Sequence, residues 1–386
     1  MACAALGLAA GETALGVFAY VAAYVFIGRR ASTGERLRAF APWGALFVGY
    51  AALYKGLGFG AYASGAYVDP IGHPGQYLAH LPARVAVFAE AALVGAPSEI
   101  TGLAPQAIPV LAALGVVAAT ALGLLLRRAV RGLDPEVRRT LAWLLAGAVL
   151  AVLPGAAGIP GDRILFLPNL GIVSALAIAL LHAGAGVPAR AGVAVFGFLH
   201  LIVAPALFAF GAQQLTSSSH AARALAARAE IPAREGVNIV GIGLSDPLVG
   251  MYLASDLALA RPERLPRAVH LLSMSPHEHR LKRVDARTLE IALVRGTLLD
   301  NALEFVVRAP DHPLHAGDLV PLGPWSVRVL EATDGRPTRF AVTFDRPLDD
   351  PSLAFIVWRE GALRALALPA VGQDITLKHE PGPMGL

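Results

Sequence analysis

The feature that most constrains this chain is a set of long apolar runs that fill its first 211 residues. The clearest is Ile164 to Leu181, which follows the polar turn of Asp162 and Arg163 and contains no charged residue. A hydrocarbon core about 30 Å thick needs about 20 mostly apolar residues in a helix. Comparable runs cover residues 1–27, 42–59, 106–126, 140–154 and 192–211. The pattern predicts an α-helical polytopic membrane bundle of about six spans.

Composition agrees with a membrane protein over this part of the chain. Only 16% of the residues of the whole chain are charged, whereas a soluble globule carries about a quarter. The deficit lies almost wholly before residue 212. The net charge is +4, but the arginines form short clusters between apolar runs instead of one basic face, so we expect no nucleic acid partner. The single cysteine, Cys3, excludes a disulfide within the chain. The expected partner of residues 1–211 is the lipid bilayer.

The arginine clusters also predict the orientation. Leu81 to Ala96 is apolar but short, begins with Pro82 and holds Arg84 and Glu90, so we expect a re-entrant or interfacial helix and not a span. With six spans, loops 28–41, 127–139 and 183–190 share one side and hold ten arginines, whereas loops 60–105 and 156–163 hold two. The positive-inside rule then places the N-terminus and the C-terminal domain outside the cytoplasm.

After residue 211 the sequence changes character. Residues 212–235 are polar and Ala-rich, which predicts a helical connector. Residues 236–243, 247–260 and 268–274 read as strand, helix and strand, the order of a small α/β unit. From residue 281 onward, short alternating segments are separated by turns such as Asp334-Gly335 and Glu360-Gly361. We therefore expect a soluble extracytoplasmic domain over 236–386, an α/β unit followed by a compact β sandwich.

Three residues of the apolar part are candidate substrate contacts. Arg163 could hold an anionic lipid phosphate by charge-assisted hydrogen bonds, with Asp162 orienting it. Alternatively, the two residues could cap the helix and pair with each other. Glu12 lies inside the first apolar run, where an ionisable group faces a polar cavity or a partner unless it reaches the interface.

Other carboxylates and histidines are open to more than one interpretation. Asp69, Glu90 and Glu99 share the predicted outer side with Arg163, so one could act as a general base, although such residues are more often solvated loop charges. His277 and His279 alternate in a segment that would point both imidazoles to one side. His270, His312 and His315 are further histidines, but no third ligand is specified, and a solvated turn is the alternative. We expect no metal and no cofactor.

Two short motifs resemble the GT-C family of polytopic membrane glycosyltransferases. Residues 162–171, DRILFLPNLG, resemble the R-x-L-Y-L-P-S motif that begins a late span of that family. Residues 6–20, LGLAAGETALGVFAY, resemble its central K-E segment, with Gly11 at the lysine position and Glu12 retained. The resemblance covers residues 1–211 and implies a polyprenyl-phosphate sugar as donor. It also implies that this chain begins near the middle of the family pattern and lacks the first outer loop, which carries the catalytic carboxylate.

The sequence therefore leaves two main functional hypotheses. The first is a GT-C-like membrane protein that handles a polyprenyl-phosphate-linked sugar, as a fragment or an inactive homologue, with Arg163, Asp162 and Glu12 as substrate contacts and no assigned catalytic residue. The second is a non-enzymatic envelope anchor that presents an extracytoplasmic binding domain. A transporter would be indicated by broken helices and by charged residues near the middle of the membrane.

Overall fold

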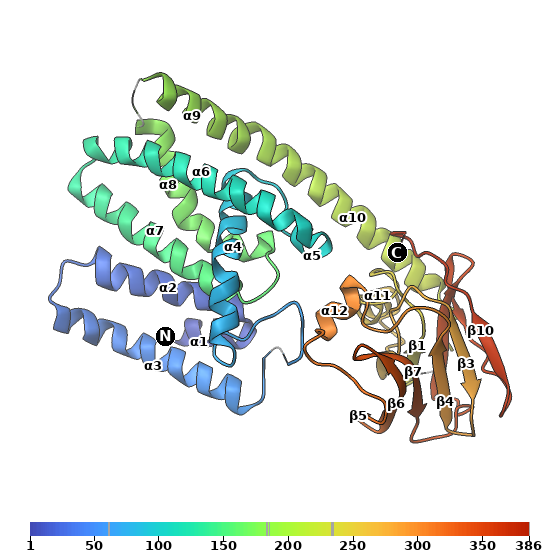
Figure 1. Ribbon diagram of the computed structural model, residues 1–386. Helices are drawn as coiled ribbons and strands as arrows, with labels where there is room; N and C mark the ends of the chain where they lie inside the picture. The colour runs from blue at the N-terminus through green and yellow to red at the C-terminus, as the bar shows by residue number, and fades with distance from the viewer. Residues whose placement is uncertain (61, 183, 185, 233–234, 386) are drawn as a thin grey trace. The chain divides into compact units, whose positions relative to one another are not determined.

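The computed structural model describes residues 1–60, 62–182, 184, 186–232 and 235–385. The chain forms two compact units. The helical unit comprises residues 1–62 and 66–210, and the C-terminal unit comprises residues 63–65 and 211–386. Each unit is described separately below (Figure 1).

The first half of the chain is built from helices. Their bounds are α1 Ala2–Ala10, η1 Glu12–Ala14, α2 Leu15–Ala23, η2 Tyr24–Gly28, α3 Thr33–Gly56, α4 Pro74–Leu93, α5 Ile100–Leu103, η3 Pro105–Ala107, α6 Ile108–Ala129, η4 Val130–Gly132, α7 Pro135–Gly155, η5 Asp162–Phe166, α8 Pro168–His182, α9 Val187–Phe198, η6 Leu199–Val203 and α10 Ala204–Arg228. Within the described residues, three continuous helices are long and apolar enough to cross a membrane, at Pro105–Gly132, Pro135–Gly155 and Val187–Arg228. Two shorter apolar helices cover Glu12–Gly28 and Pro168–His182.

The expected spans at residues 1–27 and 42–59 differ from the helices observed there, the first by a break and the second by an earlier start. The first apolar run is interrupted at Gly11, whose extended backbone separates α1 from η1 and α2. Helix α3 begins nine residues before the expected residue 42 because Ser32 forms a capping box. The Glu35 backbone N–H donates to Ser32 Oγ, and the Ser32 backbone N–H donates to Glu35 Oε2 at 2.8 Å. These bonds satisfy amide groups that have no partner within the helix.

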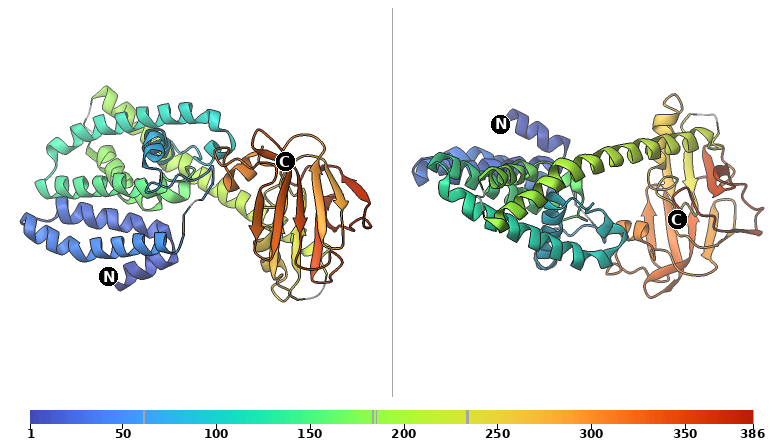
Figure 2. Two further views of the ribbon diagram at one scale, coloured as in Figure 1. Left: turned by 60° about the horizontal axis from the view of Figure 1, so that its bottom comes forward. Right: turned by 90° about the horizontal axis from the view of Figure 1, so that it is seen from above.

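Helix α4 runs across the direction of α6 and α7 and crosses α6 at very short range (Figures 1 and 2). The contact is possible because position 115 of α6 is a glycine. A Cβ atom there would lie 1.8 Å from the carbonyl oxygen of Ala86 and 2.8 Å from the backbone nitrogen of Glu90. Small residues at a helix crossing let the two backbones approach closely. Tyr77 and Arg84 attach α4 to the end of α7 through the carbonyl oxygens of Leu153 and Ala156.

The last helix of the helical unit continues into the predicted connector. Helices α9 and α10 are joined by the π-helical turn η6 and form one continuous helix from Val187 to Arg228. Only 6% of its most apolar 18-residue window is buried inside the protein. Its last turns differ, because Leu225 and Ala226 pack in the core of the C-terminal unit.

The described residues of the C-terminal unit form two sheets and two short helices, which follow the last turns of α10. Its elements are β1 Asn238–Gly241, α11 Leu253–Ala260, β2 Ala268–Leu271, β3 His279–Arg283, β4 Thr288–Leu293, α12 Ala302–Val307, β5 Leu319–Leu322, β6 Trp325–Thr333, β7 Arg336–Thr343, β8 Leu353–Arg359, β9 Ala362–Ala365 and β10 Asp374–Leu377. One sheet has the order β2-β1-β8-β9, with β1 parallel to both β2 and β8. The other has the order β10-β3-β4-β7-β6-β5, and its strands are antiparallel.

The expectation of an α/β unit followed by a separate β sandwich is therefore wrong in one respect. Strand β8 was expected in the sandwich, but it returns to the centre of the first sheet. Its residues from Leu353 to Trp358 are all buried, as a strand covered on both faces requires. The expected turns at Asp334-Gly335 and Glu360-Gly361 are present, with positive φ at all four residues.

Two cores lie on the two faces of the mixed sheet β2-β1-β8-β9. Val240, Phe355 and Val357 face the antiparallel sheet and pack against Leu289 and Phe340. On the opposite face, Ile239, Ile356 and Trp358 are covered by α11 and by the end of α10. The C-terminal unit is thus a helix layer, a mixed sheet and an antiparallel sheet.

Candidate site at the end of helix α4

The predicted residues Asp162 and Arg163 lie in η5, next to the loop that follows α4. Asp162 Oδ1 accepts hydrogen bonds from the Ser98 backbone N–H at 3.0 Å and from Ser98 Oγ at 2.6 Å. The backbone N–H of Asp162 donates to Glu99 Oε1 at 2.8 Å. Asp162 therefore connects the beginning of α8 to the loop after α4.

Asp162 and Arg163 are both exposed, but they differ in their partners. Among the residues that the structure describes, no ion pair joins its guanidinium group to Asp162 or to another carboxylate. The carboxylate of Asp162 is engaged by Ser98 instead. An unpaired guanidinium group keeps its hydrogen-bond donors available for an anion.

Glu12, the third predicted contact, lies in a different environment. It is the first residue of η1, and its carboxylate is hydrogen-bonded to the side chain of Tyr54 near the end of α3. The next residue, Lys55, forms an ion pair with Asp69. Across the described part of the chain, no hydrogen bond or ion pair brings Glu12 to Asp162 or Arg163.

Glu90 lies on a helix, as expected for residues 81–96, but the interpretation as a solvated charge is wrong, because the residue has no exposed surface. Its Oε1 accepts a hydrogen bond of 3.2 Å from the Ala96 backbone N–H. Its Oε2 is buried and has no hydrogen-bond partner within the described residues. Asp162 is close enough to act on Glu90 electrostatically. Sequence reasoning missed this burial because nothing in the sequence shows that Gly115 brings α6 against the backbone of Glu90.

His200 binds the end of the same helix. Its Nε2 lies 3.1 Å from the carbonyl oxygen of Ala92, and its Nδ1 lies 3.1 Å from that of Phe196. The last carbonyl groups of a helix have no partner within the helix. His200 therefore links α4 to the long helix 187–228 through one of these groups.

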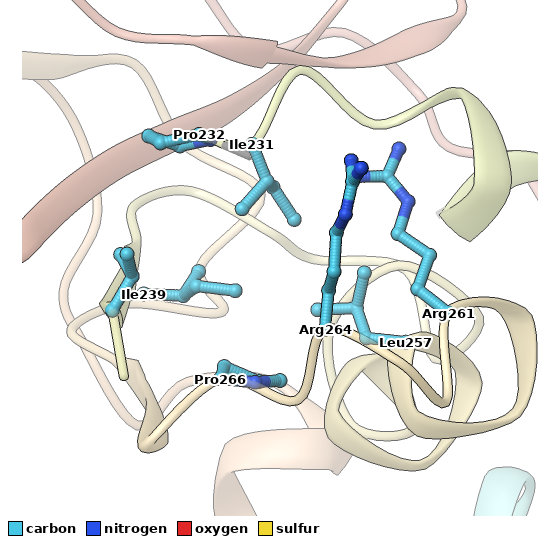
Figure 3. A pocket seen from close by; sticks show the side chains of 8 residues that line it. Ile231, Pro232, Ile239, Leu257, Arg261, Arg264 and Pro266 are labelled. Carbon is cyan, nitrogen blue, oxygen red and sulfur yellow. The ribbon is translucent and has the colours of Figure 1, made fainter. Parts of the chain in front are cut away.

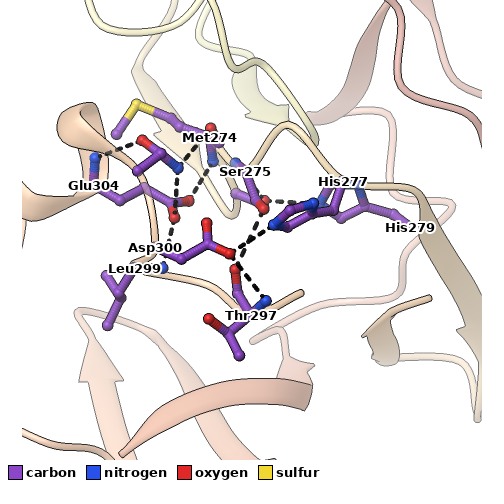
Figure 4. A network of polar contacts seen from close by, with 10 residues as sticks. Met274, Ser275, His277, His279, Thr297, Leu299, Asp300 and Glu304 are labelled. Atoms are coloured by element: carbon purple, nitrogen blue, oxygen red, sulfur yellow. Dashed lines mark hydrogen bonds and ion pairs between the residues drawn. The ribbon is translucent and has the colours of Figure 1, made fainter. Parts of the chain in front are cut away.

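His277 and His279 of the C-terminal unit lie in a second polar cluster (Figure 4). His279 is buried, so the expectation of a solvated turn is wrong for it, and its Nε2 lies 2.7 Å from Ser273 Oγ. His277 pairs with Asp300 at 2.6 Å. The two imidazoles thus have different partners, and within the described residues no three His, Cys, Asp or Glu side chains are grouped to hold a metal ion.

Burial shifts the titration of this cluster. It lowers the pKa of His279 to about 4, because a desolvated imidazole resists protonation. Burial also raises the pKa of Glu304. The Glu304 carboxylate accepts hydrogen bonds from the backbone N–H groups of Met274 at 2.9 Å and Leu299 at 2.6 Å, which connects α12 to the chain after β2.

These histidines do not line either of two cavities that lie among the described residues of the C-terminal unit. One is a depression of about 10 Å³ beside α11 (Figure 3), hardly room for one water molecule. Arg261 and Arg264 lie at its rim, and Arg261 donates to the carbonyl oxygens of Ala227 and Ala229. The other is an open groove of about 310 Å³ beside β8, between Glu230 and Asp350.

Comparisons with known proteins do not identify a family. No protein-family model matches this chain, and no match was found among curated proteins or among solved structures.

Proposed function

We propose that this chain is a multi-pass protein of a bacterial inner membrane that anchors a binding domain on the extracytoplasmic side. The continuous helix Val187–Arg228 carries this proposal. Its apolar part is almost entirely exposed, which suits a helix surrounded by lipid. Its end contributes Leu225 and Ala226 to the core of the C-terminal unit. The membrane helix is thus also a structural element of the domain.

Six crossings with an external N-terminus fit the loop contacts. Arg30, in the first arginine-rich loop, forms an ion pair with Glu136, in the second. This pair supports a common side for both loops, as the positive-inside rule requires. On the opposite side, Ser98 and Glu99 bind Asp162. Helix α4 runs across the direction of α6 and α7 (Figure 1), which suits a re-entrant helix between the two proposed sides of the membrane.

The single native cysteine makes the topology testable. Cys3 is exposed and should react with a membrane-impermeant maleimide in intact spheroplasts. In a Cys3→Ser background, we expect Gly75→Cys and Lys378→Cys to label from outside. Gly34→Cys and Gly132→Cys should label only after lysis. A Cβ at any of the three glycines meets no atom within 4 Å. Labelling of Lys378→Cys only after lysis would place the domain in the cytoplasm.

A second candidate function is the binding of a polyprenyl-phosphate-linked sugar, as the GT-C resemblance implies. The unpaired, exposed guanidinium group of Arg163 favours it, because phosphate oxygens accept charge-assisted hydrogen bonds from arginine. Asp162 fixes the backbone next to Arg163 through Ser98 and Glu99. Glu12 remains a secondary candidate by resemblance.

The lipid-phosphate hypothesis predicts a loss of affinity when Arg163 is replaced. One charge-assisted hydrogen bond contributes about 1.5–3 kcal/mol, so Arg163→Ala should weaken the binding of polyprenyl phosphate in nanodiscs by about 10-fold or more. Arg138→Ala is the matched control, because it removes one exposed arginine from a loop on the other proposed side. Equal affinities for the wild type and Arg163→Ala would exclude Arg163 as the phosphate contact.

A further inference from the structure

Helix α4 ends against the middle portions of two apolar helices. Its residues Ala86 and Glu90 meet Gly115, which lies ten residues beyond Pro105, the start of an apolar helix that runs to Gly132. Its residue Ala92 meets His200, thirteen residues beyond Val187. A helix end at this depth is found in membrane proteins where it is buried in protein or lines a binding site.

Glu90 brings an ionisable group to this depth. The residue has no exposed surface, and among the described residues its carboxylate accepts a hydrogen bond only from the Ala96 backbone N–H, at Oε1. Oε2 is buried without a partner among the described residues. A bare carboxylate in such a place costs far more free energy than a neutral carboxyl group. The site therefore favours a bound positive charge.

The neighbouring charged groups do not supply that charge. On α4 itself, Arg84 donates to the carbonyl oxygen of Ala156. From η5, Asp162 acts on Glu90 with the same sign of charge. From the long helix, His200 is engaged with two backbone carbonyl oxygens. The charged residues of α6 and α7 lie at the opposite ends of these helices, at 127–128 and 136–139.

We propose that Glu90 is an intramembrane proton-binding site, occupied at neutral pH, at the end of the re-entrant helix α4. A proton is the ligand that removes the charge of the carboxylate without requiring further ligands. Buried carboxyl groups of this kind serve as proton relays in membrane proteins. The inference depends on the proposed insertion in the membrane.

Dicyclohexylcarbodiimide tests the proposal, because it adds to protonated carboxyl groups in apolar surroundings. The carboxyl proton goes to a carbodiimide nitrogen and the carboxylate oxygen bonds to the central carbon, so nothing leaves. The full chain is first reconstituted in liposomes and recovered by flotation. It is then treated over a range of pH, and the modified peptides are identified by mass spectrometry. We expect modification at Glu90 at neutral pH, falling about 10-fold per pH unit above its midpoint.

Two variants and one salt control make the result decisive. Glu90→Gln, which mimics the protonated side chain, should float with the liposomes and lose the label. Glu99→Gln, which removes an exposed carboxylate nine residues later, should keep it. An unlabelled Glu90 in liposomes that float would overturn the proton site, whereas failure to float would overturn the membrane assignment. Protection of Glu90 by Na⁺ would overturn the proton in favour of a metal cation.

Discussion

Replacing Gly115 by alanine should separate α4 from α6 and destabilise the helical unit by about 3 kcal/mol or more, as overpacking of a tight contact does. The new methyl group would lie 1.8 Å from the Ala86 carbonyl oxygen and 2.8 Å from the Glu90 nitrogen. Both are backbone atoms, so no side-chain rotation relieves the clash. We expect a lower Tm of the full chain in detergent, with unfolding monitored by tryptophan fluorescence.

Gly123→Ala is the matched control for this prediction. Gly123 lies on the same helix α6, and a Cβ there would meet no atom within 4 Å. Alanine is favoured over glycine inside a helix by about 1 kcal/mol, so this variant should be as stable as the wild type or slightly more stable. Equal Tm values for Gly115→Ala and Gly123→Ala would contradict the close crossing.

Acidification should destabilise the C-terminal unit through His279. Its pKa is lowered from 6.5 to about 4 by burial, so the unfolded chain binds the proton more readily than the folded one. The contribution to stability is present above pH 6.5 and is lost as the pH falls toward about 4. The full loss is about 3 kcal/mol. The protection factors of the β3 amides in the intact protein, which correct for the pH dependence of intrinsic exchange, should fall correspondingly between these pH values.

A histidine substitution separates this effect from general acid destabilisation. His279→Gln removes the titrating ring, and the protection factors of the β3 amides should then depend less on pH over the same range. His315→Gln removes a histidine whose side chain is 70% exposed, and it should leave the pH dependence intact. If both variants keep the wild-type profile, His279 is not the responsible group.

The helical half of the chain could largely be read from apolar runs, because run length is set by simple geometry. The ends of the helices could not, since they depend on local contacts such as the Ser32 capping box and the extended backbone at Gly11. In the C-terminal half, the unbroken apolar run of β8 was a usable signal for a strand buried on both faces. The sequence pattern alone did not show that this strand pairs with β1, more than a hundred residues earlier.

The candidate site was accessible to sequence reasoning only in part. The DRILF segment pointed to Asp162 and Arg163, but their different environments depend on Ser98 and Glu99 in a distant loop. The sequence pattern placed Glu90 on a short helix but did not distinguish it from a solvated carboxylate. Its burial follows from a close approach of two backbones at Gly115, a long-range contact that residue types alone do not specify.

The central position of β8 also constrains how the domain can be synthesised. Strands β1 and β2 leave the ribosome long before residue 353, so the parallel sheet stays without its middle strand while β3 to β7 are made. Pairings between distant segments form slowly because a long loop must close first. The antiparallel sheet pairs strands that lie closer together in the sequence, namely β3, β4, β6 and β7. It can therefore form earlier, and β8 can then pack against it. Chains that stop before residue 353 should therefore expose the apolar faces of β1 and β2 and become targets for proteolysis.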